Sequence, residues 1–189
     1  MRIISGKLKN KKLYFPKNLK TRPLKDNVRE NIFNILEHSN NIDIKIRGSC
    51  IIDLYAGTGS FGLECLSREA SRVFFVENDK DALENLKKNI KNFKLEKQTS
   101  VYSQDVFGFF KDSNPEKKID LVFLDPPYSS EKYIEIIKTI KKNNILSKKH
   151  ILILHREKNS NKSLFDELNI IENRVYGRSE IFFLKLFWR

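Results

Sequence analysis

The stretch Asp53-Leu-Tyr-Ala-Gly57-Thr-Gly59-Ser-Phe-Gly62 decides the fold class. It begins within the last residues of an apolar run, residues 48–55, that reads as a buried strand, and it leads into a segment of helical periodicity, so it predicts the turn between a strand and a helix. Its three glycines fit the pattern G-x-G-x-x-G, in which the backbone turns sharply and approaches a nucleotide-type ligand closely. The pattern alone does not say which ligand binds.

Around this turn, β-branched and aromatic runs alternate with helical periodicity, which is typical of an α/β domain with a mostly parallel sheet. The expected strands cover residues 48–55, 73–77, 100–103, 119–124, 151–155, 170–175 and 181–188. The last two strands are predicted to form an antiparallel hairpin at one edge, around the turn at residues 176–179. A smaller hairpin is expected near the N-terminus, between residues 2–5 and 12–15.

Three helices can be placed by their apolar faces and their first residues. One begins near Asp26, and a second is capped by Asp79, because aspartate is a favoured N-cap residue. The second and third helices have apolar faces made by Leu83, Leu86 and Ile90 and by Tyr133, Ile136, Ile137 and Ile140.

Length and composition indicate a water-soluble chain of about one domain. The chain has 189 residues, 40% of them hydrophobic, and lacks an apolar run long enough for a membrane span. Its two cysteines, Cys50 and Cys65, form no C-x-x-C motif and are expected to be buried, reduced and apolar in character. The first residues show no secretory signal, so a cytoplasmic location is expected.

Positive charge is concentrated at the N-terminus. The formal net charge is +12, and residues 1–30 contain ten basic and only two acidic residues. Such a cluster favours contact with a nucleic acid over the alternative, a lysine-rich surface that is merely solvated. The residues predicted to contact RNA are Arg2, Lys7, Lys11, Lys12, Arg22 and Arg29.

Acidic residues stand at or just past the ends of the first four predicted strands: Asp53, Glu77, Asp105 and Asp125. Ligands of open α/β sheets bind beyond these strand ends, so the four acids indicate a pocket for hydrogen-bond donors and a cation. Asp53 would repel the pyrophosphate of a dinucleotide but suits the cationic amino-acid part of S-adenosylmethionine. Glu77 can accept hydrogen bonds from ribose hydroxyls. The three histidines lack metal-ligand spacing, so no metal site is predicted.

The fourth strand ends in Asp125-Pro126-Pro127-Tyr128, which points to methylation of a base amine. The Asp125 carboxylate and the Pro126 carbonyl can accept both amine hydrogens and turn the nitrogen lone pair toward the methyl donor. The prolines restrict the backbone and carry no N–H group, and Tyr128 offers a flat face for an extruded base. These four residues are the predicted catalytic set.

These motifs, together with Thr21-Arg22-Pro23 and the run Asn27 to Asn34, resemble the RsmD family, which methylates N2 of a guanine in 16S ribosomal RNA. The resemblance implies a Rossmann-like class I methyltransferase fold: seven strands, the last antiparallel, after an N-terminal hairpin and helix. It also implies that the glycine turn holds methionine, Glu77 the ribose and Asp105 the adenine. The expected cofactor-binding set is Asp53, Tyr55, Ala56, Gly57, Thr58, Gly59, Glu77, Asn78, Asp105 and Val106.

Two residues depart from the family pattern. Ser5 stands where a glycine is common, and Leu24 where a threonine is expected after Thr-Arg-Pro. Both positions are expected to lie away from the chemistry and to affect local RNA contacts only.

The sequence therefore predicts a basic extension, residues 1–40, before a methyltransferase domain, residues 41–189, that uses S-adenosylmethionine. The expected substrate is 16S rRNA, within a 30S subunit or an assembly intermediate, and the expected state is a monomer. Three alternatives remain open: an N6-adenine DNA methyltransferase, a non-catalytic rRNA-binding assembly factor, and a nicotinamide-dependent oxidoreductase. Asp53 and the missing second substrate domain disfavour the last of these.

Overall fold

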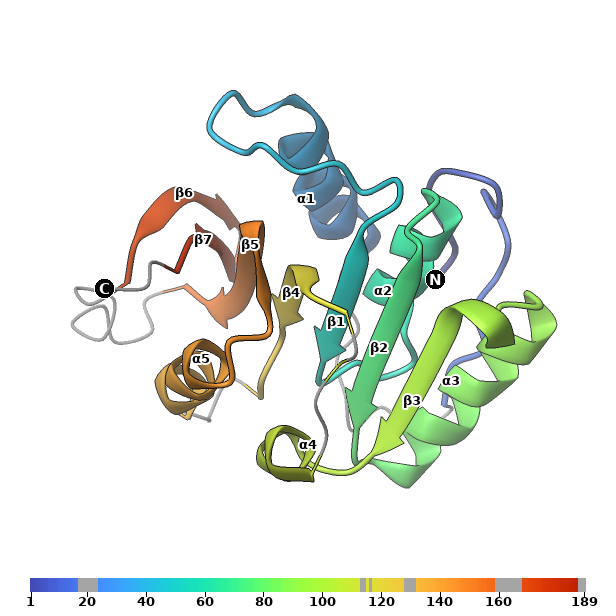
Figure 1. Ribbon diagram of the computed structural model, residues 1–189. Helices are drawn as coiled ribbons and strands as arrows, with labels where there is room; N and C mark the ends of the chain where they lie inside the picture. The colour runs from blue at the N-terminus through green and yellow to red at the C-terminus, as the bar shows by residue number, and fades with distance from the viewer. Residues whose placement is uncertain (17–23, 113–114, 116, 128–131, 159–167, 187–189) are drawn as a thin grey trace.

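A computed structural model describes residues 1–16, 24–112, 115, 117–127, 132–158 and 168–186. Its centre is a seven-stranded sheet with the order β3-β2-β1-β4-β5-β7-β6 (Figure 1). The strands are β1 (Cys50–Leu54), β2 (Arg72–Glu77), β3 (Thr99–Ser103), β4 (Ile119–Leu124), β5 (Leu146–Glu157), β6 (Ile170–Tyr176) and β7 (Ser179–Leu184). Neighbouring strands among β1 to β5 pair in parallel, whereas β7 is antiparallel to β5 and to β6.

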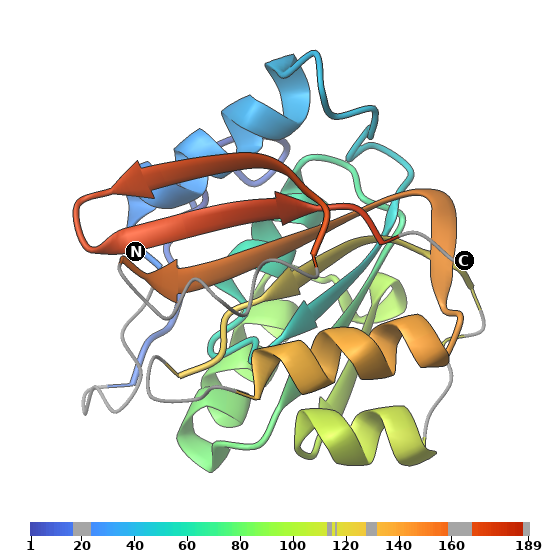
Figure 2. The same ribbon diagram turned by 90° about the vertical axis from the view of Figure 1, so that its left-hand side faces the viewer.

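Helices cover both faces of the sheet. They are α1 (Asp26–His38), α2 (Ser60–Ser67), α3 (Lys80–Asn92), α4 (Val106–Asp112) and α5 (Tyr133–Lys142), with a short 3₁₀ turn, η1 (Glu96–Gln98). In Figure 2, α1 lies on one side of the sheet and α4 and α5 on the other. The central strands β1 and β4 are therefore buried on both faces, which explains why they are almost continuously apolar.

Each face of the sheet has its own apolar core. Alternate residues of the strands pack against α1, α2 and α3 on one face, Phe75 and Phe123 among them. The residues between them pack against α4 and α5 on the other, with Val122 and Leu124 as examples. This alternation follows from the two-residue period of a strand. The same alternation continues into the first residues after a strand and sets the face of the sheet on which their side chains lie.

Most predicted elements are confirmed, with small shifts in their ends. β4 has the predicted bounds, the β6–β7 hairpin forms one edge of the sheet, and the Asp79 side chain caps α3 by accepting from the Ala82 N–H at 2.8 Å. β5 begins at Leu146, earlier than predicted, and its pairing with β4 shifts register between Ile119 and Leu121. Residues 147–149 are polar, so the sequence pattern did not indicate this first part of the strand. Of the predicted β7 run, residues 187–188 lie outside the described part.

The N-terminal residues pack against one face of the central sheet. The predicted hairpin is reduced to one antiparallel bridge, between Arg2 and Lys12. Asp26 begins α1 but does not cap it; Lys25 holds the cap position without a side-chain bond. Apolar residues of this part, such as Ile3 and Leu13, belong to the same core as the sheet. The domain division near residue 40 stays a prediction.

Gly6 allows the N-terminal segment to lie directly on α2. Its φ is +81°, and a Cβ atom there would stand 2.0 Å from the Ser67 carbonyl oxygen. Only glycine can accept this conformation and this approach. The contact lets the Lys7 N–H donate to the same carbonyl at 2.8 Å and the Leu8 N–H to the Ser67 hydroxyl at 2.9 Å.

Two general expectations can be compared with the described residues. Both cysteines are buried and unpaired, as predicted. Within the described part of the chain, we find no helix with the length and apolar character needed to cross a bilayer.

Candidate active site

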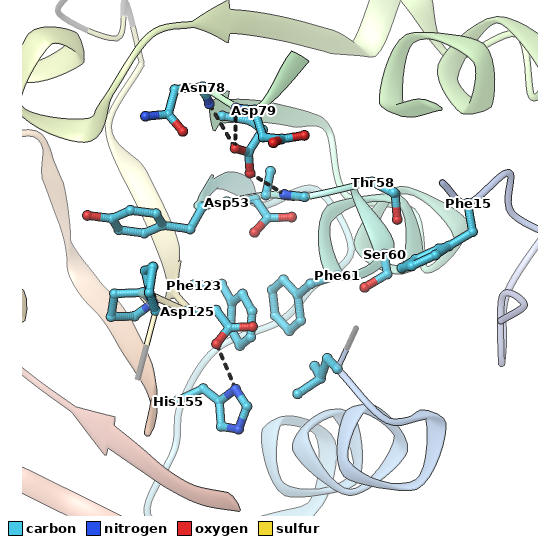
Figure 3. A pocket seen from close by; sticks show the side chains of 17 residues that line it. Phe15, Asp53, Thr58, Ser60, Phe61, Asn78, Asp79, Phe123, Asp125 and His155 are labelled. Atoms are coloured by element: carbon cyan, nitrogen blue, oxygen red, sulfur yellow. Dashed lines mark hydrogen bonds and ion pairs between the residues drawn. The ribbon is translucent and has the colours of Figure 1, made fainter. Parts of the chain in front are cut away.

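A cavity of about 460 Å³ opens beyond the carboxyl ends of the central strands. It lies near the junction of β1 and β4, where the strand order reverses and open α/β sheets bind their ligands. Figure 3 shows its lining side chains converging from β1, β2, β4, β5 and the N-terminal segment. The lining residues are Phe15, Leu24, Asp53, Tyr55, Ala56, Gly57, Thr58, Ser60, Phe61, Glu77, Asn78, Asp79, Phe123, Asp125, Pro126, Pro127 and His155.

The glycine turn forms the floor between β1 and α2. Gly57 and Gly59 have φ values of +56° and +82°, which the left-handed course of this turn requires. Gly62 has a different role: a Cβ atom there would lie 2.3 Å from the Phe75 ring, so α2 can approach β2 closely only without a side chain. The Gly62 N–H donates to the Asp53 carboxylate at 3.0 Å, which joins the start of α2 to the end of β1.

Glu77 ties the glycine turn to the end of β2. One carboxylate oxygen accepts from the Gly57 N–H at 2.7 Å, and the other accepts from the N–H groups of Asn78 and Asp79 at 2.8 Å each. A carboxylate has about four acceptor sites, so capacity remains for a ligand hydroxyl. The side chain is 7% exposed and lines the cavity.

Carboxylates give the cavity a negative character. Asp53 is 1% exposed, and burial raises its pKa well above the usual value, with smaller upward effects from Asp125 and Glu77 and an opposing one from the Gly62 N–H. Among the described residues that line the cavity, none is lysine or arginine. A cationic ligand would favour the ionised form of Asp53, whereas a pyrophosphate would be repelled. The residues therefore fit the ammonium and sulfonium of S-adenosylmethionine better than they fit the pyrophosphate of a dinucleotide.

The segment after β4 forms the opposite wall. The Asp125 side chain is 22% exposed and receives a contact of 2.7 Å from His155. Pro126 is buried, and the Pro127 carbonyl accepts from Arg156 at 3.1 Å. Beside them, the rings of Phe61 and Phe123 stack with centroids 4.0 Å apart and give the cavity an apolar side (Figure 3).

Most predicted site residues are brought together by the fold. Ten of them line the cavity: Asp53, Tyr55, Ala56, Gly57, Thr58, Glu77, Asn78, Asp125, Pro126 and Pro127. Gly59, Asp105 and Val106 are not in its lining, and Tyr128 lies outside the described residues. Asp105 is exposed and caps α4, because its carboxylate accepts from the N–H groups of Phe107 and Gly108 at 2.9 and 3.0 Å. Its contact with adenine stays a prediction.

Sequence reasoning missed the part of the wall made by the N-terminal segment. Phe15 and Leu24 line the cavity, although they lie far from the glycine turn in sequence. Buried Asn89 on α3 holds the backbone next to Phe15: its amide accepts from the Tyr14 N–H at 2.7 Å and donates to the carbonyls of Tyr14 and Thr58 at 3.2 and 3.1 Å. The expectation that Leu24 is remote from the chemistry was therefore wrong.

The predicted RNA contacts divide into three groups. Arg2, Lys7, Lys11 and Lys12 are exposed, although Lys7 is paired with Glu69 at 2.7 Å. Arg22 lies outside the described residues.

Arg29 was predicted wrongly as an RNA contact. It is 0% exposed and donates to the Arg2 carbonyl and, at 3.0 Å, to the Asp26 carboxylate. Burial lowers its pKa, and Asp26 and Glu64 oppose that change. Its charge serves the packing of α1 on the N-terminal segment.

Metal binding finds no support in the described residues, where no three His, Cys, Asp or Glu side chains form a group able to hold an ion.

The parallel sheet with an antiparallel β7, together with a carboxylate-lined cavity at the switch point, defines an S-adenosylmethionine-dependent methyltransferase of the class I fold. The chain belongs to the family described as Conserved hypothetical protein 95, whose model matches residues 1–185.

Related proteins support this placement. "Ribosomal RNA small subunit methyltransferase D" of Haemophilus influenzae is 34% identical over 178 residues, which cover 94% of this chain and 89% of the relative. The protein of the same name from Escherichia coli K12 is 30% identical over 157 residues, which cover 83% of this chain and 75% of the relative. Among solved structures, yhhF of Escherichia coli has a TM-score of 0.81 at 25% identity and covers 97% of this chain and 96% of its own. The predicted resemblance to the RsmD family is confirmed.

Proposed function

We propose that this chain transfers a methyl group from S-adenosylmethionine to the exocyclic N2 of a guanine in 16S ribosomal RNA. One observation carries the proposal: the Asp125-Pro126-Pro127 segment forms one wall of a cavity whose other walls hold Asp53, Glu77 and the glycine turn. The donor and acceptor sides of a methyl transfer thus face one cavity. The names of the relatives, which specify small-subunit ribosomal RNA, support the substrate class.

The acceptor wall would prepare the amine for attack. The Asp125 carboxylate and the Pro126 carbonyl accept the two N2 hydrogens, so the nitrogen lone pair turns away from the guanine ring. S-adenosylmethionine supplies a methyl group on a positively charged sulfur. As the N–C bond forms and the C–S bond breaks, positive charge develops on the amine, and the fixed Asp125 carboxylate stabilises it. Base stacking by Tyr128 belongs to this proposal as a prediction.

The opposite walls would hold the cofactor. Asp53 and the backbone of Gly57 and Gly59 surround the methionine part, and Glu77 receives the ribose hydroxyls. Asp105 and Val106, just past β3, are proposed for the adenine. Support comes from the three carboxylates of the lining, Asp53, Glu77 and Asp125, and from the absence of lysine and arginine among its described residues.

The exposed N-terminal segment is proposed as the RNA-binding part. Lys11 and Lys12 are exposed and lie only three to four residues before Phe15, which lines the cavity. At up to about 3.5 Å per residue, this places them within roughly 14 Å of the cavity wall. The chain is proposed to act as a monomer in the cytoplasm on a 30S subunit or an assembly intermediate.

Reversing the charge of Lys11 and Lys12 should weaken RNA binding and reduce its salt dependence. The double variant Lys11→Glu/Lys12→Glu loses two phosphate contacts. Each contact with single-stranded RNA contributes about 0.7 to the slope of log K against log salt. We therefore expect the slope to fall by about 1.4 in filter-binding titrations of 16S rRNA fragments.

A matched control carries the same charge change elsewhere. Lys141→Glu/Lys142→Glu alters exposed residues at the end of α5, on the opposite face of the sheet. Its slope should fall by less than half as much. Equal slopes for the two double variants would show that the N-terminal lysines act only through net charge.

The test of the function is methyl transfer followed by nucleoside analysis. Labelled cofactor is incubated with the chain and either 16S rRNA, 30S particles or duplex DNA, and the product is digested to nucleosides. We expect N2-methylguanosine from the ribosomal substrates alone. Methyladenine from DNA would favour the adenine methyltransferase. Absence of both transfer and calorimetric cofactor binding would favour a non-catalytic assembly factor.

A further inference from the structure

The register between β4 and β5 places a histidine beside the proposed catalytic carboxylate. Leu124 pairs with Leu154 in the parallel ladder, so the next residues, Asp125 and His155, stand side by side just past that pair. The His155 Nδ1 atom lies 2.7 Å from Asp125 Oδ1 (Figure 3). His155 is 5% exposed, so this contact is formed largely away from solvent.

The following residue of β5 holds the other end of the same segment. Arg156 points to the opposite face of the sheet, where its Nη1 donates to the Pro127 carbonyl at 3.1 Å. It is 2% exposed, and its guanidinium lies 4.7 Å from the centre of the Tyr133 ring. Two consecutive β5 residues therefore fix the Asp125–Pro127 segment from both faces.

We propose that His155 is a positioning residue that fixes the rotation of the Asp125 carboxylate for methyl transfer. A carboxylate only accepts hydrogen bonds, so His155 Nδ1 carries a hydrogen and donates a hydrogen bond to Asp125 Oδ1. This leaves Oδ2 to accept from the substrate amine. The role deepens the proposed function and rests on it, but nothing in the Asp-Pro-Pro-Tyr motif itself requires a histidine on the neighbouring strand.

The need for such a residue follows from the exposure of Asp125. Its side chain is 22% exposed, and without a partner it would rotate among conformers in which Oδ2 points away from the amine. A misplacement of about 1 Å can cost about 100-fold in rate, because the reacting atoms must be held close and aligned. Arg156 already restrains the peptide next to the Pro126 carbonyl, which is the backbone acceptor. The Asp125 carboxylate is the acceptor that could still turn, and His155 restrains it.

Three substitutions at His155 separate hydrogen bonding from packing. In His155→Asn the amide nitrogen falls near the position of Nδ1, whereas in His155→Gln it falls near Nε2. His155→Phe keeps the ring and removes the donor. We expect kcat on 30S particles or 16S rRNA to fall about 10- to 100-fold in the Phe and Gln variants, and less than about 5-fold in the Asn variant. The KM for RNA and the Kd for cofactor should stay within about twofold.

Each outcome bears on the proposal. Full kcat in His155→Phe would overturn it, and so would an Asn variant as slow as the Gln variant. If the Phe variant fails to fold, as judged by its thermal midpoint, the comparison of the Asn and Gln variants decides alone. A wild-type chain that methylates no ribosomal substrate would instead overturn the proposed function, and the positioning role with it. Transfer by wild type with equal rates in all three variants would overturn the positioning role only.

Discussion

Methyl transfer should be lost when Asp125 is replaced by alanine. The variant removes the carboxylate that would accept an amine hydrogen and stabilise the developing positive charge, and removal of one such fixed group typically costs 10²- to 10³-fold in kcat. We therefore expect initial rates on the ribosomal substrate to fall by at least about 10²-fold. The measurement is transfer of labelled methyl groups at saturating cofactor and RNA.

The fold should tolerate this change, which makes the result interpretable. The Asp125 backbone N–H bonds to the Leu54 carbonyl, and no described backbone group bonds to the Asp125 side chain. Calorimetry should give a cofactor Kd close to that of wild type. Asp125→Asn is the matched variant: it keeps the volume and loses the charge, so it should remain slow. A fully active alanine variant would remove Asp125 from the chemistry.

The central part of the fold could be predicted because its signals are local. The apolar run of β4, the glycine turn and the Asp79 cap each depend on a few adjacent residues, and all three appear where the sequence indicated. The acids at the strand ends could also be placed, since parallel strands bring their carboxyl ends to one edge. This is why Asp53, Glu77 and Asp125 were correctly brought to one cavity.

What could not be predicted depends on contacts between distant residues. Phe15 lies in the cavity wall next to Tyr14, whose backbone is bound by Asn89, 75 residues later in the chain, and Leu24 lines the same wall just before α1. The contact of His155 with Asp125 depends on which strand lies beside β4, and sequence patterns do not give strand order. From the sequence, Asp105 can be interpreted either as a ligand-binding residue or as a helix cap, because an aspartate after a strand serves both roles.

Arg29 shows that the exposure of a charged side chain also depends on contacts with distant residues. In sequence it continues a run of basic residues, and nothing nearby marks it as buried. Besides Asp26, the acid that faces it is Glu64 on α2, which is also 0% exposed and comes 35 positions later in the chain. Counting charges along a segment therefore overestimates the surface available to RNA, because one of these cations is used to attach the segment to the domain.

Replacing Glu64 by alanine should therefore destabilise the protein strongly. The Glu64 carboxylate accepts from the N–H groups of Ile4 and Ser5 at 2.7 and 2.9 Å and from Arg68 Nε at 3.0 Å, and it lies 3.9 Å from Arg29 Nε. Its removal leaves Arg29 buried with less compensation and two backbone donors without an acceptor. Breaking a buried ion pair in this way costs about 3–5 kcal/mol of unfolding free energy.

Urea unfolding can measure this loss, and an ion pair of Arg68, the residue just past α2, supplies the control. Glu37, whose side chain is 41% exposed, also pairs with Arg68, so Glu37→Ala removes an exposed ion pair and should cost less than about 1 kcal/mol. Amide exchange in Glu64→Ala should rise first at Ile4 and Ser5, since their acceptor is gone. Similar losses in the two variants would mean that burial does not set the strength of this cluster. A large difference would show that the buried Glu64 carboxylate contributes more to attaching the basic N-terminal segment than an exposed ion pair of the same cluster does.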